Sequence, residues 1–224
     1  MRGAQRRSNL KFFRGFNWII GGDMVTSLTY ADVFRPCEKK NAVLYDVALI
    51  IGGSLLIGLS AQIAVKLPFS AVPVTCQTLA VLIAGALLGR IRGSLCVLTY
   101  LAEGAAGLPV FALGRGGLAA LAGPSGGYLI GFAAAAYITG FLAEKGWDRR
   151  FATTILAMLL GNAAIYGFGL FWLVILTGMS GMILTAGLYP FVIGDILKII
   201  IAAAILPAGW KLLAAAGFKS EKMK

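Results

Sequence analysis

The sequence predicts an all-α integral membrane protein with six transmembrane helices and a ligand pocket in the outer half of the membrane. Composition is the first indication, because 59% of the 224 residues are hydrophobic, 13% are charged, and the mean hydropathy is +0.86. A soluble domain has about 45–50% apolar and about 25% charged residues. The other two indications are long apolar runs and short clusters of charge between them.

Six apolar segments have lengths near the roughly 20 residues that span a bilayer. Their sequence limits are 43–64, 74–89, 91–109, 128–143, 151–177 and 188–213. Only Arg90 separates the second segment from the third, which predicts a tight helical hairpin. The fifth and sixth segments are long enough to tilt or to extend beyond the hydrocarbon.

The basic residues predict the orientation of these segments. The chain has 20 Lys and Arg against 9 Asp and Glu, concentrated in the N-terminal tail, the second-to-third turn, the fourth-to-fifth loop and the C-terminal end. The opposite side has only Lys66 and Arg115. Because Lys and Arg accumulate on cytoplasmic loops, both termini are expected in the cytoplasm. The membrane domain is then 42–214, between basic tails at 1–41 and 215–224.

Residues 1–23 are rich in Arg and have no acid before Asp23. Three interpretations stay open for this segment. In the first, the start is assigned too early and Met24 is the first residue of the protein. In the second, the segment is an organellar targeting segment. In the third, it is a basic tail that lies on anionic lipid.

Missing residue types exclude several functions. The sequence has no His, which excludes His-dependent catalytic triads and HExxH zinc sites, and it has no P-loop motif for ATP hydrolysis. Its three cysteines are scattered and suggest neither a disulfide framework nor a metal site. The basic excess follows the membrane segments, so no nucleic-acid partner is expected. We therefore expect no catalytic residue, no metal and no cofactor.

Ionisable residues inside the segments are the first candidates for a ligand site, because a charge at the centre of a membrane helix costs about 2.5–3.5 kcal/mol on insertion scales. Asp195 and Lys198 are three residues apart and share one helix face. They form either a ligand clamp or a self-compensating ion pair. Glu103, in the outer half of the third segment, either binds ligand or fixes helix packing. Asp46 lies near the cytoplasmic end and is interpreted as structural.

Further polar groups are expected on the same outer side. They are Thr75, Gln77, Arg115, Ser125 and Tyr128. With the outer half polar and the inner half largely apolar, the sequence predicts a capped pocket. A suitable ligand is small and mostly apolar, with a polar head and a carboxylate for Arg115 or Lys198.

Small residues at four-residue spacing lie on the first segment, where Ala48 pairs with Gly52 and Ser54 with Gly58. Such stripes let helices approach closely in lipid. They indicate either a docking surface for a membrane partner or ordinary packing within the bundle.

A series of motifs carries a resemblance to a known family. The motifs are AVPVTCQT (71–78), AGALLG (84–89), YLAEGAAGLPVF (100–111), GPSGGY (123–128), GNAAIYGFGLFWL (161–173) and GDILK (194–198). In this order and spacing the chain resembles the BioY family, the biotin-specific substrate-capture subunits of energy-coupling factor (ECF) vitamin transporters. The resemblance covers nearly the whole expected membrane core and excludes the tail before Met24.

The resemblance implies a six-helix subunit of the plasma membrane, embedded in the lipid bilayer, that binds biotin from outside. It also implies a membrane coupling protein and two cytoplasmic ATPase subunits as partners. The family's ligand-contacting aspartate and lysine fall on Asp195 and Lys198, which we assign to the ureido head of biotin. For the carboxylate, the alternatives are Arg115 or Ser125 with the backbone of Gly126 and Gly127.

Thr75, Gln77, Glu103 and Tyr128 also lie in matching motifs and are candidate substrate-binding residues. Three rival functions stay open: an ECF capture subunit for another vitamin, a stand-alone biotin transporter, and an intramembrane enzyme.

Overall fold

The computed structural model describes residues 28–68, 70, 72–178, 184 and 187–216. The segment 1–23, with its alternative interpretations, lies outside the described residues. The same holds for most of the C-terminal tail expected at 215–224.

Four helices of the described part are long and apolar enough to cross a membrane. They are α3 (Lys39–Gln62), α7 (Gly126–Ala143), α8 (Phe151–Thr177) and α10 (Tyr189–Ala215). At a rise of 1.5 Å per residue, α7 is about 27 Å long and the others are longer. These helices coincide with the first, fourth, fifth and sixth expected segments, and their ends lie within a few residues of the expected limits.

The second and third expected segments are helical but shorter than expected. Helices α4 (Gln77–Leu88) and α5 (Arg90–Ala105) have 12 and 16 residues, or about 18 and 24 Å, against a hydrocarbon core of about 30 Å. The start of the second segment is instead strand β2 (Val74–Thr75), which pairs antiparallel with β1 (Ala64–Val65). The β-branched Val74 and Thr75 favour extended backbone there.

The expected tight hairpin between α4 and α5 is present. Gly89 alone separates the helices and has φ +84°, a value that residues with a side chain rarely adopt. A Cβ at this position would also lie 2.8 Å from Glu144 Oε1. That carboxylate accepts a hydrogen bond from the Arg90 N–H over 2.9 Å, so it caps the beginning of α5.

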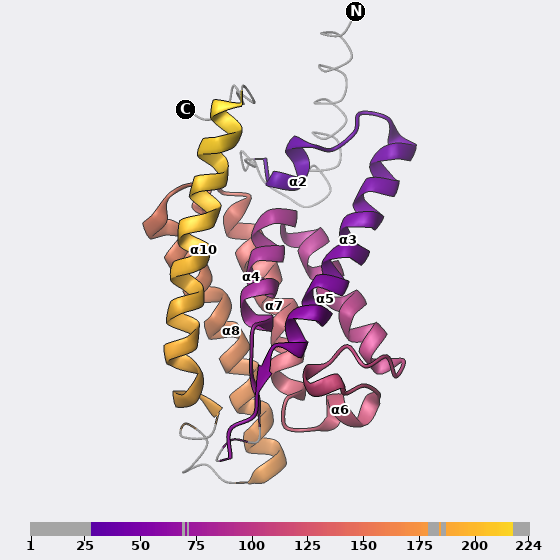
Figure 1. The fold of residues 1–224 in the computed structure, drawn as a ribbon, viewed down its shortest axis with the longest axis vertical. Helices are drawn as coiled ribbons and strands as arrows, with labels where there is room; N and C mark the ends of the chain where they lie inside the picture. The colour runs from indigo at the N-terminus through magenta and orange to yellow at the C-terminus, as the bar shows by residue number, and fades with distance from the viewer. Residues whose placement is uncertain (1–27, 69, 71, 179–183, 185–186, 217–224) are drawn as a thin grey trace, which may run out of the picture.

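Helix α7 lies in the middle of the bundle (Figure 1). It packs against α4, α5 and α8, while α3 packs on α5 at one side and α10 packs on α8 at the other. The largest side chains of the core include Tyr100, Ile57, Leu82 and Met158, which are fully buried between these helices.

One end of the bundle carries the short helix α2 (Tyr30–Val33) and the starts of α3 and α5. The Arg92 guanidinium joins these elements, because it pairs with Asp32 at 2.8 Å and with Asp46 at 3.0 Å. Asp46 also pairs with Arg35 at 2.6 Å. This network explains Asp46 as a structural residue, as the sequence suggested.

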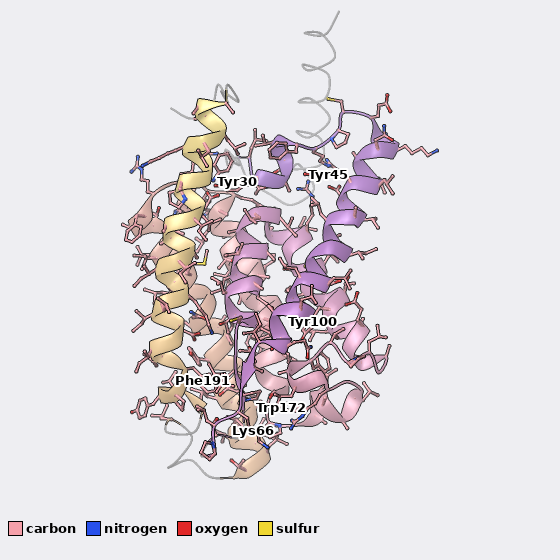
Figure 2. All side chains as sticks on the ribbon, viewed as in Figure 1. Tyr30, Tyr45, Lys66, Tyr100, Trp172 and Phe191 are labelled. Carbon is pink, nitrogen blue, oxygen red and sulfur yellow. The ribbon has the colours of Figure 1, made fainter. Side chains whose placement is uncertain are left out.

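The same end also brings together α2, α10 and η3 (Trp147–Arg149), the short helix between α7 and α8. The Tyr30 hydroxyl donates to the Leu206 carbonyl oxygen, and its ring lies 4.4 Å from the Trp210 ring. The Trp210 N–H donates to Asp148 Oδ2 over 2.6 Å. Tyr30 and Tyr45 mark this end in Figure 2, whereas Lys66, Trp172 and Phe191 mark the opposite one. The opposite end holds the β-hairpin, η2 (Ala112–Gly114) and α6 (Leu118–Ala122).

Candidate ligand-binding site

A cavity opens at the end of the bundle that holds the β-hairpin. It contains about 720 Å³ of space, counting its open mouth, and lies between β2, α4, α7, α8, α10 and the loop around η2. Much of its wall is aromatic, and the ring-bearing residues are Phe111, Tyr128, Phe132, Tyr166 and Phe191. Its mostly apolar wall is typical of small-molecule sites.

Asp195 and Lys198 form an ion pair in the wall of this cavity. Lys198 Nζ lies 3.0 Å from Asp195 Oδ1, and the two side chains are only 7% and 13% exposed for Asp195 and Lys198. One helical turn of α10 places both on the same face, as their spacing predicted. The Lys198 ammonium also donates to the Thr75 carbonyl oxygen over 2.7 Å and to Thr78 Oγ1 over 2.8 Å. All three of its N–H groups therefore have acceptors.

Two residues outside the predicted set of substrate-binding residues complete the surroundings of Asp195. Thr78 Oγ1 donates to Asp195 Oδ1 over 3.2 Å, and the Tyr166 hydroxyl donates to Asp195 Oδ2. A carboxylate has about four lone-pair sites, and three are used here, so one acceptor site stays for a ligand N–H. Thr78 follows Gln77 in the AVPVTCQT motif, which was the available signal for it. Tyr166 lies in the GNAAIYGFGLFWL motif, which was the available signal for it.

Thr75 and Gln77 adjoin this pair where β2 passes into α4. Thr75 Oγ1 donates to Gln77 Oε1 over 3.2 Å and accepts the Gln77 backbone N–H over 3.3 Å. Gln77 Nε2 in turn donates to the Tyr100 hydroxyl over 2.5 Å. Both Thr75 and Gln77 line the cavity, and the Gln77 side chain is almost wholly buried.

Arg115 lines the same cavity and is exposed, in the loop after η2. Its backbone carbonyl accepts the Phe111 N–H over 2.9 Å, which closes the loop into a tight turn. No ion pair involves Arg115 among the residues that the structure describes. Its guanidinium is thus available for an anionic group of a ligand at the mouth.

At the start of α7, the expected residues divide between the cavity and the helix packing. Ser125 and Tyr128 line the cavity, and the Tyr128 hydroxyl donates to the Gly187 carbonyl oxygen over 2.8 Å. Gly126 and Gly127 instead let α7 approach its neighbours. A Cβ on Gly127 would lie 2.5 Å from the Phe168 carbonyl oxygen, and the Gly126 N–H already donates to the Gly123 carbonyl over 3.0 Å.

Glu103 is not among the residues that line the cavity. Its side chain is directed toward α3, where Oε1 lies 2.9 Å from Ser54 Oγ. Its Oε2 is buried with no hydrogen-bond partner among the described residues. The neighbouring Gly104 is the residue that contacts the Phe111 ring on the cavity side. The geometry therefore favours the second of the two expectations for Glu103, a residue that fixes helix packing.

The small residues of α3 also divide between two faces. Ala48 and Gly52 are exposed, and a Cβ on Gly52 would have no neighbour within 4 Å. Ser54 and Gly58 are buried in the bundle, where Ser54 contacts Glu103 and Gly58 packs against Val110. The burial of Ser54 and Gly58 favours the second interpretation for these two residues, ordinary packing within the bundle.

The protein is a bundle of apolar helices, several of them long enough to cross a membrane, around a cavity with a buried acid–base pair. This arrangement defines a membrane protein that binds a small ligand with a polar head. The comparisons with known proteins narrow this class. The chain belongs to the BioY family, because the sequence model of that family matches residues 33–215.

Relatives and a solved structure agree with this family. The biotin transporter BioY of Rhodobacter capsulatus is 41% identical, over 71% of this chain and 90% of its own length. The biotin transporter BioY of Rhizobium etli is 34% identical, over 72% and 92%. The fold is similar to the crystal structure of an S-component for biotin from an ECF-type ABC transporter, with a TM-score of 0.69 and 26% identity. That match covers 78% of this chain and 95% of the solved one.

Proposed function

We propose that this chain takes up biotin as the substrate-binding S subunit of an ECF-type transporter in the cell membrane. The observation that carries the proposal is the Asp195–Lys198 pair in the cavity wall, in a chain whose relatives are named biotin transporters. The chain is a multi-pass membrane protein and not an enzyme.

The cavity suits biotin at both ends of the molecule. A cyclic urea presents two N–H donors and one carbonyl acceptor. One N–H matches the free lone pair of Asp195, and the carbonyl would replace Thr78 Oγ1 as an acceptor of the Lys198 ammonium. The fused rings suit the aromatic wall. The carboxylate of the side chain suits Arg115 at the mouth. Thr75, Gln77, Thr78, Tyr128 and Tyr166 are proposed to frame the ureido head, with Ser125 near the tail.

The proposed topology has six membrane crossings with both termini in the cytoplasm. The network of Arg35, Arg92 and their acids, together with Arg90, Lys145 and Arg149, lies at the end of the bundle that holds α2 and the last turns of α10. By the positive-inside rule this end is cytoplasmic, which makes the cavity open to the outside. The short helices α4 and α5 cross because the β-hairpin and the η2 loop continue them within the protein, where non-helical backbone is tolerated.

ATP hydrolysis is assigned to partners. The sequence has no P-loop, so energy for release into the cytoplasm comes from two ATPase subunits through a membrane coupling protein. We assign contact with the coupling protein to the exposed face of α3 at Ala48 and Gly52. Biotin is the ligand, and the proposed mechanism uses no metal and no other cofactor.

Equilibrium binding to the purified chain tests the proposal. Biotin should stabilise the detergent-solubilised protein saturably in a thermal-shift titration, while thiamine should have no effect. Asp195→Asn should raise the dissociation constant for biotin at least tenfold, about 1.4 kcal/mol. Asp148→Asn is the matched control, because Asp148 is equally buried and accepts an N–H at the opposite end of the bundle.

Two results would contradict the assignment. Stabilisation by thiamine in place of biotin would indicate a capture subunit for another vitamin. No response to either, in folded protein free of bound biotin, would refute biotin capture.

A further inference from the structure

Tyr100 is fully buried on α5 and is not among the residues that line the cavity, yet it contacts two elements of the cavity wall. Its hydroxyl accepts from Gln77 Nε2 over 2.5 Å at the beginning of α4. Its ring meets the Phe111 ring edge-on, with 5.4 Å between centroids and 79° between planes. Figure 2 shows Tyr100 between the two ends of the bundle.

The contact with Gln77 continues to the acid–base pair. Gln77 bonds Thr75 through its side chain and through its backbone N–H. The carbonyl oxygen of Thr75 is in turn an acceptor of the Lys198 ammonium, at 2.7 Å. A series of hydrogen bonds therefore runs from α5 through the β2–α4 junction to α10.

We propose that Tyr100 is a positioning residue for the ligand site, acting through Gln77 on Thr75 and Lys198. This inference rests on the proposed function, because biotin binding is its measure. Thr75 belongs to the two-residue strand β2, and so short a hairpin is marginal without support from the core. Tyr100 supplies that support from a fully buried position. Its ring also contacts Phe111 in the loop before η2, so one side chain aligns two parts of the cavity wall.

The Phe111 contact depends on Gly104, one turn after Tyr100. A Cβ on Gly104 would overlap the Phe111 ring, so glycine at this position lets the ring reach Tyr100. The YLAEGAAGLPVF segment thus contains Tyr100, Gly104 and Phe111, the three residues that form this contact. This gives the motif a physical reason that does not involve ligand contact by Glu103.

Tyr100→Phe tests the inference, because it removes the hydroxyl and keeps the ring against Phe111. The dissociation constant for biotin should rise about fivefold, the range of one net hydrogen bond. Tyr45→Phe is the matched control, because the Tyr45 hydroxyl donates to the Ala31 carbonyl at the opposite end of the bundle. Both variants should lose a similar amount of thermal stability, and only Tyr100→Phe should lose affinity.

A double-mutant cycle with Gln77→Leu separates positioning from general packing. In the Gln77→Leu background, Tyr100→Phe should change biotin affinity less than twofold, since the connection is already broken. An equal loss in both backgrounds would overturn the route through Gln77. Wild-type affinity for Tyr100→Phe would overturn the whole inference, provided that the wild-type chain binds biotin in the same assay. If the wild-type chain does not bind, the proposed function itself has failed.

A second variant still allows the inference to be refuted if Tyr100→Phe does not fold. Gln77→Leu alone leaves Tyr100 in place and breaks the same series of bonds. It should weaken biotin binding at least fivefold, and unchanged binding in that variant would equally overturn the inference.

Discussion

The Lys198 ammonium donates to the backbone carbonyl oxygen of Thr75 over 2.7 Å, although the two residues are 123 positions apart in the chain. The bond joins α10 to the β-hairpin that borders the cavity mouth. Because the acceptor is backbone, its position depends on the fold of the β2–α4 junction and not on the identity of residue 75. Lys198 is therefore a candidate ligand-binding residue and also connects α10 to the β-hairpin.

Replacing Lys198 with Ala should weaken biotin binding at least tenfold. The change removes the donor proposed for the ureido carbonyl and leaves Asp195 buried without its charge partner, which is costly. Thermal stability should fall as well. Lys211→Ala, an exposed lysine on the same helix, should change neither property. Isothermal titration with biotin compares the two variants. Equal affinity of both variants for biotin would show that Lys198 only holds the β-hairpin against α10.

Arg115→Gln should weaken binding of biotin about tenfold and leave binding of biotin methyl ester unchanged. The guanidinium pairs with a carboxylate through charge, and an ester lacks that charge. Competition titrations with the two ligands measure the difference. An equal loss for both ligands would assign Arg115 to loop structure, whereas no loss for either would favour Ser125 at the start of α7 as the carboxylate site.

Gly127→Ala should destabilise the protein, by about 1–3 kcal/mol, because the added methyl meets Phe168 and Trp172 where α7 packs on α8. Gly167→Ala is the matched control on α8, since a Cβ there has no neighbour within 4 Å. That control should be neutral or stabilise by about 0.5–1 kcal/mol through helix propensity. Thermal unfolding in detergent checks both. A stable Gly127→Ala variant would mean that the α7–α8 contact adjusts readily.

The sequence was a good guide to the long helices and to much of the cavity. The apolar runs bounded by charged residues predicted the ends of α3, α7, α8 and α10 within a few residues. Charged side chains stay in water, so they mark where a lipid-exposed helix leaves the membrane. The prediction of a helix failed just before α4, because Val74 and Thr75 are apolar or small enough to lie in a membrane helix or in a strand. The β-branched Val74 and Thr75 favour extended backbone, but the continuous apolar run concealed this local preference.

Helix rotation explains the errors in the candidate site. Glu103 and Gly104 are neighbours in sequence, but successive residues differ by about 100° around a helix, and only Gly104 faces the cavity side. The small residues of α3 follow the same rule. Gly52 and Ser54 differ by about 200°, so they lie on opposite faces and could not share one docking surface. The contacts of Tyr166 and Thr78 with Asp195 were not predicted, because they depend on where Asp195 lies in space.

Gly52→Leu should impair association with a membrane coupling protein and leave biotin binding by the isolated chain unchanged. A Cβ at this position meets nothing within 4 Å in the described part of the chain. Leucine would enlarge the exposed face of α3, where close approach of another helix needs small residues. Gly194→Leu is the matched control on α10, since a Cβ there also has no neighbour within 4 Å. Co-purification from membranes that contain the coupling protein and ATPases measures association. Normal assembly of Gly52→Leu would remove α3 from the proposed interface.

The free energy of unfolding should depend on pH through Asp148, at the end of the bundle opposite the cavity. Burial raises the pKa of this carboxyl from 3.8 to about 6, although the Trp210 N–H and Arg149 act in the opposite direction. The folded protein therefore binds this proton more tightly than the unfolded chain does. The stabilisation is complete below about pH 4 and is lost as the pH rises through about 6.

Asp148→Asn isolates this contribution, because the amide oxygen still accepts the Trp210 N–H and the side chain cannot ionise. The melting temperature of the wild type relative to this variant should fall by at least about 3 °C between pH 5 and pH 7.5. Glu38→Gln, at an exposed acid before α3, should show no such relative change. A wild-type curve parallel to that of Asp148→Asn would mean that Asp148 keeps an ordinary pKa in the folded protein. In that case water or the surrounding polar groups solvate its buried oxygen as well as bulk solvent does.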